Sequence, residues 1–384
     1  MLTATEMLGD ESAGRGGCKR KADAPTGRAL FKQLEQTARL GCGCGGKLLP
    51  DLPDFSKEMP RRCKCYDNFT PMQTHLLPAG WFSTLHGAVK PLAAATRAGV
   101  SLLTPLAFPF TANSVCYQRD LSCFFEHTEI EHYCDAQGKP PQVVSLKSEE
   151  FVRNESHSVH GDAIMPTPWR SRGWFWYSSQ LLSWIMRPNA KLTGDLNNAM
   201  VETGLAAALR RGPVLGVHVR HGDACLAKEQ RRMGRVCRSL EAHLARVREY
   251  ARAHNIRTAY LATDSELVLE EARRNTEFQF LFLPNVARHR ETPKVIWDKT
   301  VAQRVRKGLN KHNYREAWLA TLDAMLLAKT DVLVGQMTST LFRSAISLRA
   351  AKCDCLLPFV SLDAPFCSDY GVKAGRSPDG AFWC

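Results

Sequence analysis

A short run of apolar and β-branched residues, 214–219, ends in a group of ionisable side chains. The run is too short and too β-branched for a helix, and its unbroken hydrophobicity predicts a strand buried in a parallel sheet. His218, Arg220, His221 and Asp223 lie at or just beyond its carboxyl end. Open α/β sheets bind their ligands in the crevice beyond the carboxyl ends of the strands. This segment therefore predicts both a sheet and the place of a site on it.

Strand and helix patterns alternate strictly after this first strand. Short apolar runs predict strands at 258–263, 278–283, 331–335 and 355–360. Apolar residues at helical spacing predict helices at 239–254, 265–274, 314–329 and 339–351. This alternation is typical of a doubly wound, Rossmann-like parallel sheet. Glycine-rich phosphate motifs are absent after these strands, so other groups would have to hold a phosphate.

The remainder of the chain divides into regions of different composition. Residues 1–66 are rich in Gly, Lys, Arg and Cys, and we expect a poorly structured or disulfide-tied leader there. Residues 67–195 contain a glycine turn, an amphipathic helix, a short strand and a Trp-rich helix, which together predict an N-terminal α/β domain. A polar connector at 189–212 would lead to the sheet domain, 213–360, and 361–384 would form a C-terminal tail.

The composition limits the possible partners. A formal net charge of +13 favours an anionic ligand. The basic residues are scattered and no nucleic-acid module is visible, so a nucleotide phosphate fits better than DNA or RNA. Fourteen cysteines suggest an oxidising compartment. We expect no membrane span in this chain, because prolines interrupt its most apolar stretch, 98–115, and no targeting segment is visible at its start.

Three predicted strand ends bring polar groups to one crevice. Arg220 follows the first strand, Asp264 follows the second, and the third runs into a hydroxyl-bearing turn, Thr338 and Ser339, at a helix start. The first amides of a helix, together with such hydroxyls, form an anion site. Arg220 adds a permanently charged, bidentate donor. The sequence therefore predicts a diphosphate clamp without a glycine-rich loop and without a metal.

Segments 216–223, 259–264 and 331–343 resemble, in order and spacing, three motifs of the α1,6-fucosyltransferases of N-glycan cores and bacterial Nod factors. The protein O-fucosyltransferases share the pattern more distantly. The resemblance implies a GT-B-like α/β fold, with two facing Rossmann-like domains and the donor site in the C-terminal one. It implies an inverting, metal-independent transfer of fucose from GDP-fucose to a glycan or glycoprotein acceptor. In the family's best-matched pattern the fucose is α1,6-linked to an N-glycan core. It also implies the secretory pathway, with the Golgi lumen as the compartment, and no cofactor.

Carried over by position, the resemblance assigns roles to individual residues. Arg220 would hold the β-phosphate and Ser339 would add a hydrogen bond at the helix start. His218 and Asp323 would contact the guanosine. The other donor-binding residues that it implies are His221, Asp264, Thr338 and Arg343.

The catalytic residues that the resemblance implies are Arg220, Asp223 and Glu229. Asp223 would organise the loop after the first strand, and Glu229 would be the candidate base. The chain departs from the family's pattern at two positions: His221 stands where close relatives have a second arginine, and Ala224 stands where a lysine is usual.

Two other functions remain open from the sequence. Arg220, His221 and Gly222 form the triplet of histidine phosphatases, in which the histidine accepts the phosphoryl group. That triplet usually lies near the start of its domain, and this function leaves the other two motifs unexplained. The departures at His221 and Ala224 also allow a catalytically inactive protein that binds a nucleotide sugar or a carbohydrate.

Overall fold

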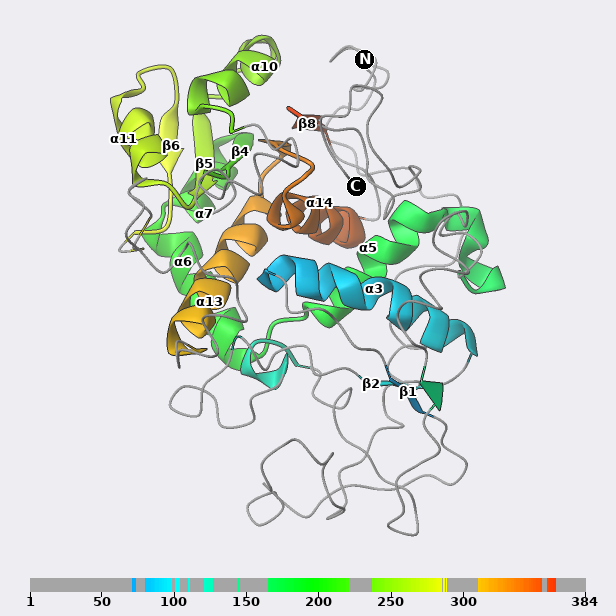
Figure 1. The fold of residues 1–384 in the computed structure, drawn as a ribbon. Helices are drawn as coiled ribbons and strands as arrows, with labels where there is room; N and C mark the ends of the chain where they lie inside the picture. Colours follow the sequence, from blue (N-terminus) through cyan, green and yellow to red (C-terminus); the bar gives the residue numbers. More distant parts are fainter. Residues whose placement is uncertain are drawn as a thin grey trace.

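The structure is a computed structural model of the protein. It describes residues 71–73, 80–98, 101–103, 110, 121–126, 144–145, 165–221, 237–284, 286, 288, 310–353 and 358–363. Two parallel sheets and the helices around them form the described part of the chain (Figure 1). This arrangement confirms the predicted α/β class.

The larger sheet has five parallel strands in the order β6-β5-β4-β7-β8. Its strands are β4 (Val214–Val219), β5 (Thr258–Thr263), β6 (Gln279–Leu281), β7 (Val332–Gly335) and β8 (Phe359–Ser361). The strand predictions are confirmed with small shifts in their bounds. The chain moves from β4 outward to β6 and then returns to the other side of β4 for β7. The carboxyl ends of β4 and β7 therefore flank the point where the strand order reverses, which is where doubly wound sheets bind ligands.

Helices cover both faces of this sheet. They are α10 (Leu240–Ala253), α11 (Glu266–Arg274), α13 (Asn310–Leu327) and α14 (Thr340–Cys353). Successive side chains of a strand point to opposite faces, so β5 divides its residues between two cores. Ala259 and Leu261 pack with α10 and α11, whereas Tyr260 and Ala262 belong to the core that contains α13 and α14. Both faces are buried, which explains the unbroken hydrophobicity of these strands.

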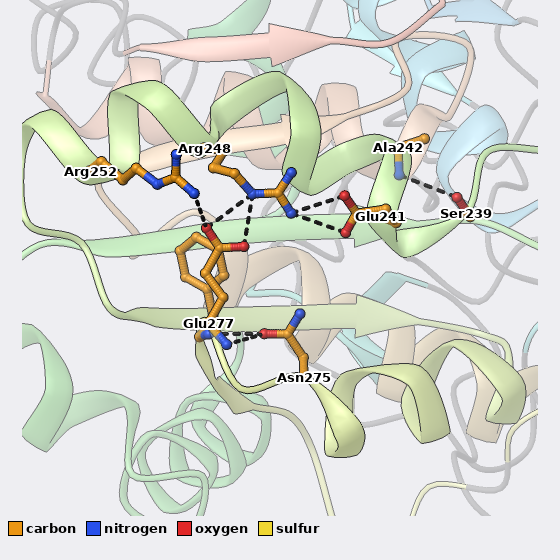
Figure 2. A network of polar contacts seen from close by, with 8 residues as sticks. Ser239, Glu241, Ala242, Arg248, Arg252, Asn275 and Glu277 are labelled. Atoms are coloured by element: carbon orange, nitrogen blue, oxygen red, sulfur yellow. Dashed lines mark hydrogen bonds and ion pairs between the residues drawn. The ribbon is translucent and has the colours of Figure 1, made fainter.

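A charged network fastens α10 to the turn before β6 (Figure 2). Arg248 Nε donates to Glu277 Oε2 at 2.8 Å, and Arg248 Nη2 donates to Glu241 Oε1 at 2.9 Å. Asn275 Oδ1 accepts from the backbone N–H of Glu277 at 3.0 Å and so shapes the same turn. The side chain of Ser239 caps α10 by accepting from the Ala242 N–H at 3.2 Å. These contacts fix α10 against the turn that leads into the edge strand β6.

The N-terminal part contains a second, three-stranded parallel sheet in the order β2-β1-β3. Its elements are β1 (Pro71–Gln73), β2 (Ser101–Leu103), β3 (Val144–Ser145) and the long helix α3 (Trp81–Ala98) between the first two strands. A short 3-10 helix, η5 (Thr167–Arg172), precedes the Trp-rich helix α5 (Trp174–Ile185). Figure 1 shows α3, α5 and α14 between the two sheets. A single apolar core joins α3 and α5 to α13 and α14.

The prediction of a polar connector at 189–212 is wrong. The segment forms two helices, α6 (Ala190–Glu202) and α7 (Leu205–Arg211). Asn189 starts α6 as an N-cap, because its side chain accepts from the Leu192 N–H at 2.8 Å. Leu192, Leu196 and Ala199 then follow at helical spacing and are buried. Polar residues fill only the exposed face, and they concealed the apolar stripe in the sequence.

The predicted domain boundary at 195 falls inside α6, and the predicted boundary at 360 falls inside β8. Within the described residues, no helix has the length and apolar character of a membrane span. Cys123 and Cys237 are both disulfide-bonded.

Candidate functional site

An ion pair joins the ends of β4 and β5. The two strands run parallel, with Val219 beside Thr263, so the residues that follow them, Arg220 and Asp264, are neighbours. Arg220 Nη1 donates to Asp264 Oδ2 at 2.5 Å, and the His221 backbone N–H donates to Asp264 Oδ1 at 2.8 Å. One carboxylate therefore orients the guanidinium and holds the backbone that follows it. The Arg220 side chain remains 37% exposed, so it is anchored on the sheet and open to solvent.

The imidazole of His221 points to α10 rather than along the strand. Its Nε2 lies 2.8 Å from the carbonyl oxygen of Arg238, in the segment just before α10. A carbonyl only accepts, so Nε2 carries the proton in this contact. His221 thus connects the end of β4 to the start of α10.

His218 is buried on the face of β4 that packs against α14, opposite the face that α10 covers. It is 2% exposed, and its ring stacks on Phe342 of α14 at a centroid distance of 6.1 Å. Burial lowers the pKa of His218 to about 3, so the imidazole is neutral. Arg220 and Asp264 lie close enough to influence it electrostatically. Among the described residues, its Nδ1 has no hydrogen-bond partner.

Asp323 on α13 lies on the same face of the sheet as His218. Its Oδ1 accepts from the Tyr260 hydroxyl at 2.6 Å. Burial raises the pKa of Asp323 to about 7, although the Tyr260 hydrogen bond and the nearby Arg288 oppose this shift. Close to neutral pH, this buried carboxyl group is therefore divided between its protonated and ionised forms.

The turn between β7 and α14 is held from the end of β8. The Met337 N–H donates to Asp363 Oδ1 at 2.7 Å, and the Thr338 hydroxyl donates to Asp363 Oδ2 at 2.5 Å. The Ser339 N–H donates to the Gln336 carbonyl at 3.0 Å and thereby closes the turn. The first amides of α14, from Thr340 onward, have no partner within their own helix, as in any α-helix. The turn therefore presents Ser339 and a helix N-terminus beside the strand ends.

The start of α3 meets the start of α14. Ser83 Oγ lies 3.3 Å from Thr340 Oγ1, and His86 Nε2 lies 2.9 Å from Ser344 Oγ. The Ser344 hydroxyl already donates to the Thr340 carbonyl at 2.9 Å, so it accepts from His86 Nε2–H. Sequence reasoning missed both contacts, because nothing in the spacing of α3 indicates which helix of the other half it meets.

Arg288 is a further residue that sequence reasoning missed. Its guanidinium donates to the carbonyl of Thr263 at 3.2 Å, of Leu283 at 3.0 Å and of Val286 at 3.3 Å. It therefore ties the segment after β6 to the end of β5, directly before Asp264. The sequence around a single arginine in a loop does not indicate which backbone carbonyls the arginine will contact.

The predicted site residues thus fall into two groups. The structure brings together His218, Arg220, His221 and Asp264 at the β4 and β5 ends, with Asp323 beneath them, and it places Thr338, Ser339 and Arg343 at the turn and first part of α14. Asp223 and Glu229 lie outside the described residues. Among the residues that are described, no group of His, Cys, Asp and Glu side chains could hold a metal ion.

Comparison with known proteins identifies the family. Residues 167–365, a little over half of the chain, match the family model of the alpha-(1,6)-fucosyltransferase N- and catalytic domains. The chain belongs to this family. It is also 28% identical to the alpha-(1,6)-fucosyltransferase of Drosophila melanogaster over 155 residues. That match covers 38% of this chain and 22% of the relative, so the chain spans less than a quarter of the relative's length.

Solved structures offer more distant likenesses. The NodZ alpha-1,6-fucosyltransferase co-crystallized with GDP is 15% identical, covers 78% of this chain and 97% of its own, and has a TM-score of 0.40. POFUT1 in complex with GDP is 11% identical, covers 79% of this chain and 99% of its own, and has a TM-score of 0.38. The family assignment rests on the match of the sequence.

Proposed function

We propose that this protein is a fucosyltransferase that moves fucose from GDP-fucose to a glycan or glycoprotein acceptor. The observation that carries this proposal is the place of Arg220 and the β7–α14 turn. Both lie at the switch point of a parallel sheet, within the part of the chain that matches the family's catalytic region. A guanidinium and a helix N-terminus at the carboxyl ends of neighbouring strands suit a diphosphate.

In this proposal Arg220 holds the β-phosphate of the donor. Negative charge grows on the departing GDP as the bond between fucose and phosphate breaks, while the sugar becomes oxocarbenium-like. A fixed cation at the β-phosphate therefore stabilises the transition state more than the ground state. Asp264 supports this role, because its ion pair holds Arg220 in place before the donor arrives. The charge is supplied by the protein, so the proposed transfer is metal-independent.

The remaining roles follow from the resemblance and from the positions of the side chains. Ser339 would donate to the phosphate at the start of α14, and His218 and Asp323 would contact the guanosine from the α13 and α14 side of the sheet. A neutral His218 can accept a hydrogen bond at one ring nitrogen. An inverting transfer needs a base for the acceptor hydroxyl. Glu229 is the candidate for it, and Asp223 would organise the loop after β4.

A panel of sugar nucleotides tests the proposal. Purified protein is incubated with GDP-fucose, GDP-mannose and UDP-galactose, and thermal stability and GDP release are followed with glycan acceptors. We expect GDP and GDP-fucose to raise the melting temperature, since a ligand at about 100 times its Kd adds about 2.7 kcal/mol of stability. Stabilisation without transfer would indicate the inactive relative. Hydrolysis of a phosphomonoester that His221→Ala abolishes would instead support the histidine phosphatase.

We also propose that the protein acts in the secretory pathway, in the Golgi lumen. The disulfide-bonded Cys123 and Cys237 support an oxidising compartment. Fractionation of cells that express the full-length protein tests this proposal, and recovery in a reducing compartment would contradict it.

A further inference from the structure

Asp363 lies just beyond β8, past the predicted end of the sheet domain, and yet it contacts the turn on which the donor site depends. Its two carboxylate oxygens accept from the Met337 N–H at 2.7 Å and from the Thr338 hydroxyl at 2.5 Å. Gln336 Nε2 and the Ser361 hydroxyl lie 3.4 Å and 3.3 Å from the same carboxylate. The Leu362 N–H also donates to the Gly335 carbonyl at 2.9 Å. The residues after β8 are thus joined to the end of β7.

These contacts fix the direction of the Thr338 hydroxyl. A hydroxyl has one proton, and this one is committed to Asp363. Towards a ligand, Thr338 can therefore only accept a hydrogen bond. A phosphate oxygen also only accepts, so Thr338 cannot serve it while Asp363 is in place. The phosphate donors of this turn are then Ser339 and the first amides of α14.

We propose that Asp363 is a positioning residue of the donor site. It holds the β7–α14 turn so that Ser339 and the α14 N-terminus face the diphosphate, and it directs the Thr338 proton away from that position. This inference rests on the proposed function. It assigns Asp363 no contact with the donor, because both of its oxygens are occupied by the turn.

The negative charge of Asp363 allows positioning to be distinguished from simple electrostatics by the direction in which GDP affinity changes. Asp363 brings a carboxylate close to a site for an anion, so its removal would strengthen GDP binding if electrostatics alone mattered. Positioning predicts the opposite result. We expect Asp363→Ala to weaken GDP binding about tenfold. A displaced turn would lose a hydrogen bond from Ser339 or the α14 amides to the charged phosphate, and such a bond contributes about that factor. Asp363→Asn keeps one acceptor oxygen for the Met337 N–H and should lie between the wild type and Asp363→Ala.

The matched control is Asp331, a second aspartate that fastens the same sheet. Its Oδ2 accepts from the Val214 N–H at 2.8 Å, at the amino end of β4 and therefore at the opposite end of the sheet. Asp331→Asn should lower the melting temperature as Asp363→Asn does, because each change replaces a carboxylate that accepts from a backbone N–H with a neutral amide. It should leave the Kd for GDP within about twofold of the wild type, a change of well under 1 kcal/mol.

Calorimetric titration with GDP, melting curves and a double-mutant cycle provide the measurements. If Asp363 acts through Thr338, then Asp363→Asn and Thr338→Val together should weaken binding less than the product of their separate effects. GDP binding by Asp363→Ala that equals or exceeds that of the wild type would overturn the inference. Losses that are fully multiplicative would overturn the route through Thr338. Failure of the wild type itself to bind GDP would instead reject the proposed function, so the two failures are distinguishable.

Discussion

At the scale of single residues, Arg220 is a cation that is oriented before the ligand arrives. Its partner Asp264 also holds the backbone N–H of His221, so the ion pair and the loop geometry depend on one carboxylate. Pre-orientation lowers the cost of arranging the site during the reaction. An imidazole stands at position 221, where the resemblance implies a second arginine, and an imidazole lacks the permanent charge of a guanidinium.

The first prediction concerns this guanidinium. Arg220→Ala should lower the turnover of GDP-fucose by a factor of at least about 100, because leaving-group stabilisation is lost. Arg220→Lys should recover little, since the bidentate fork is lost. Arg257, an exposed arginine directly before β5, provides the control, and Arg257→Ala should leave turnover unchanged. Steady-state kinetics decide the outcome, and near wild-type transfer by Arg220→Ala would reject the mechanism.

The second prediction concerns the buried carboxyl group of Asp323. Its pKa is raised from 3.8 to about 7 in the folded protein, so its contribution to stability is lost as pH rises through that interval. His218, with its pKa lowered from 6.5 to about 3, loses its contribution as pH falls below 6.5. Asp323→Asn cannot titrate and should keep the Tyr260 hydrogen bond.

Melting curves of both proteins across pH test this prediction. The melting temperature of Asp323→Asn relative to the wild type should rise between about pH 4 and about pH 7, because only the wild type must ionise a buried group. The effect of His218 is common to both proteins and cancels in the difference. A difference that does not change with pH would contradict the raised pKa.

The sequence predicted those site residues that follow directly from strand ends. Arg220 and Asp264 belong to this group, because parallel strands with aligned ends bring their next residues together. Asp363 could have been included by the same rule, but the predicted domain ended at 360. Arg288 and His86 could not have been found, since their contacts depend on how distant elements pack.

At the scale of elements, the close approach of β7 and α14 depends on a residue without a side chain. A Cβ at Gly335 would lie 2.6 Å from the Phe342 ring, which is closer than carbon atoms approach without displacement. The same ring stacks on His218. A change at Gly335 would therefore be transmitted to the proposed guanosine contact through Phe342.

The third prediction follows from this contact. Gly335→Ala should lower the melting temperature and weaken GDP binding, because overpacking a core typically costs about 1–3 kcal/mol. Gly194 lies inside α6, and a Cβ there would meet nothing within 4 Å. Gly194→Ala should therefore raise stability by up to about 1 kcal/mol and leave GDP binding unchanged. If both variants behave alike, the contact with Phe342 is not responsible.

Most strands and helices of the larger sheet were predicted because each carries its own periodic pattern. The segment 189–212 was not, because α6 shows its apolar stripe only when residues are compared four and seven positions apart. Its many polar residues made a connector the simpler interpretation. Local composition was informative for buried strands and misleading for a half-exposed helix.

At the scale of the whole molecule, the structure differs from two independently packed units. Trp81 at the start of α3 donates from Nε1 to Thr321 Oγ1 on α13 at 2.8 Å, and this contact is buried. His86 bonds to Ser344 on α14. The sequence indicated two α/β halves, but it could not show that the helices between the sheets share one core, because that packing involves residues more than 200 positions apart.

The last prediction tests this shared core. Leu85 of α3 is fully buried in it, and Leu85→Ala should cost about 2–5 kcal/mol of stability. If the core is shared, hydrogen exchange of the β4 and β5 amides should accelerate together with that of α3, because both protections then reflect one global opening. Leu267 on α11 is 43% exposed, and Leu267→Ala should change neither. Faster exchange confined to α3 and α5 would show that the N-terminal half opens alone. Arg220 would then keep its position while Ser83 and His86 lost their contacts with α14.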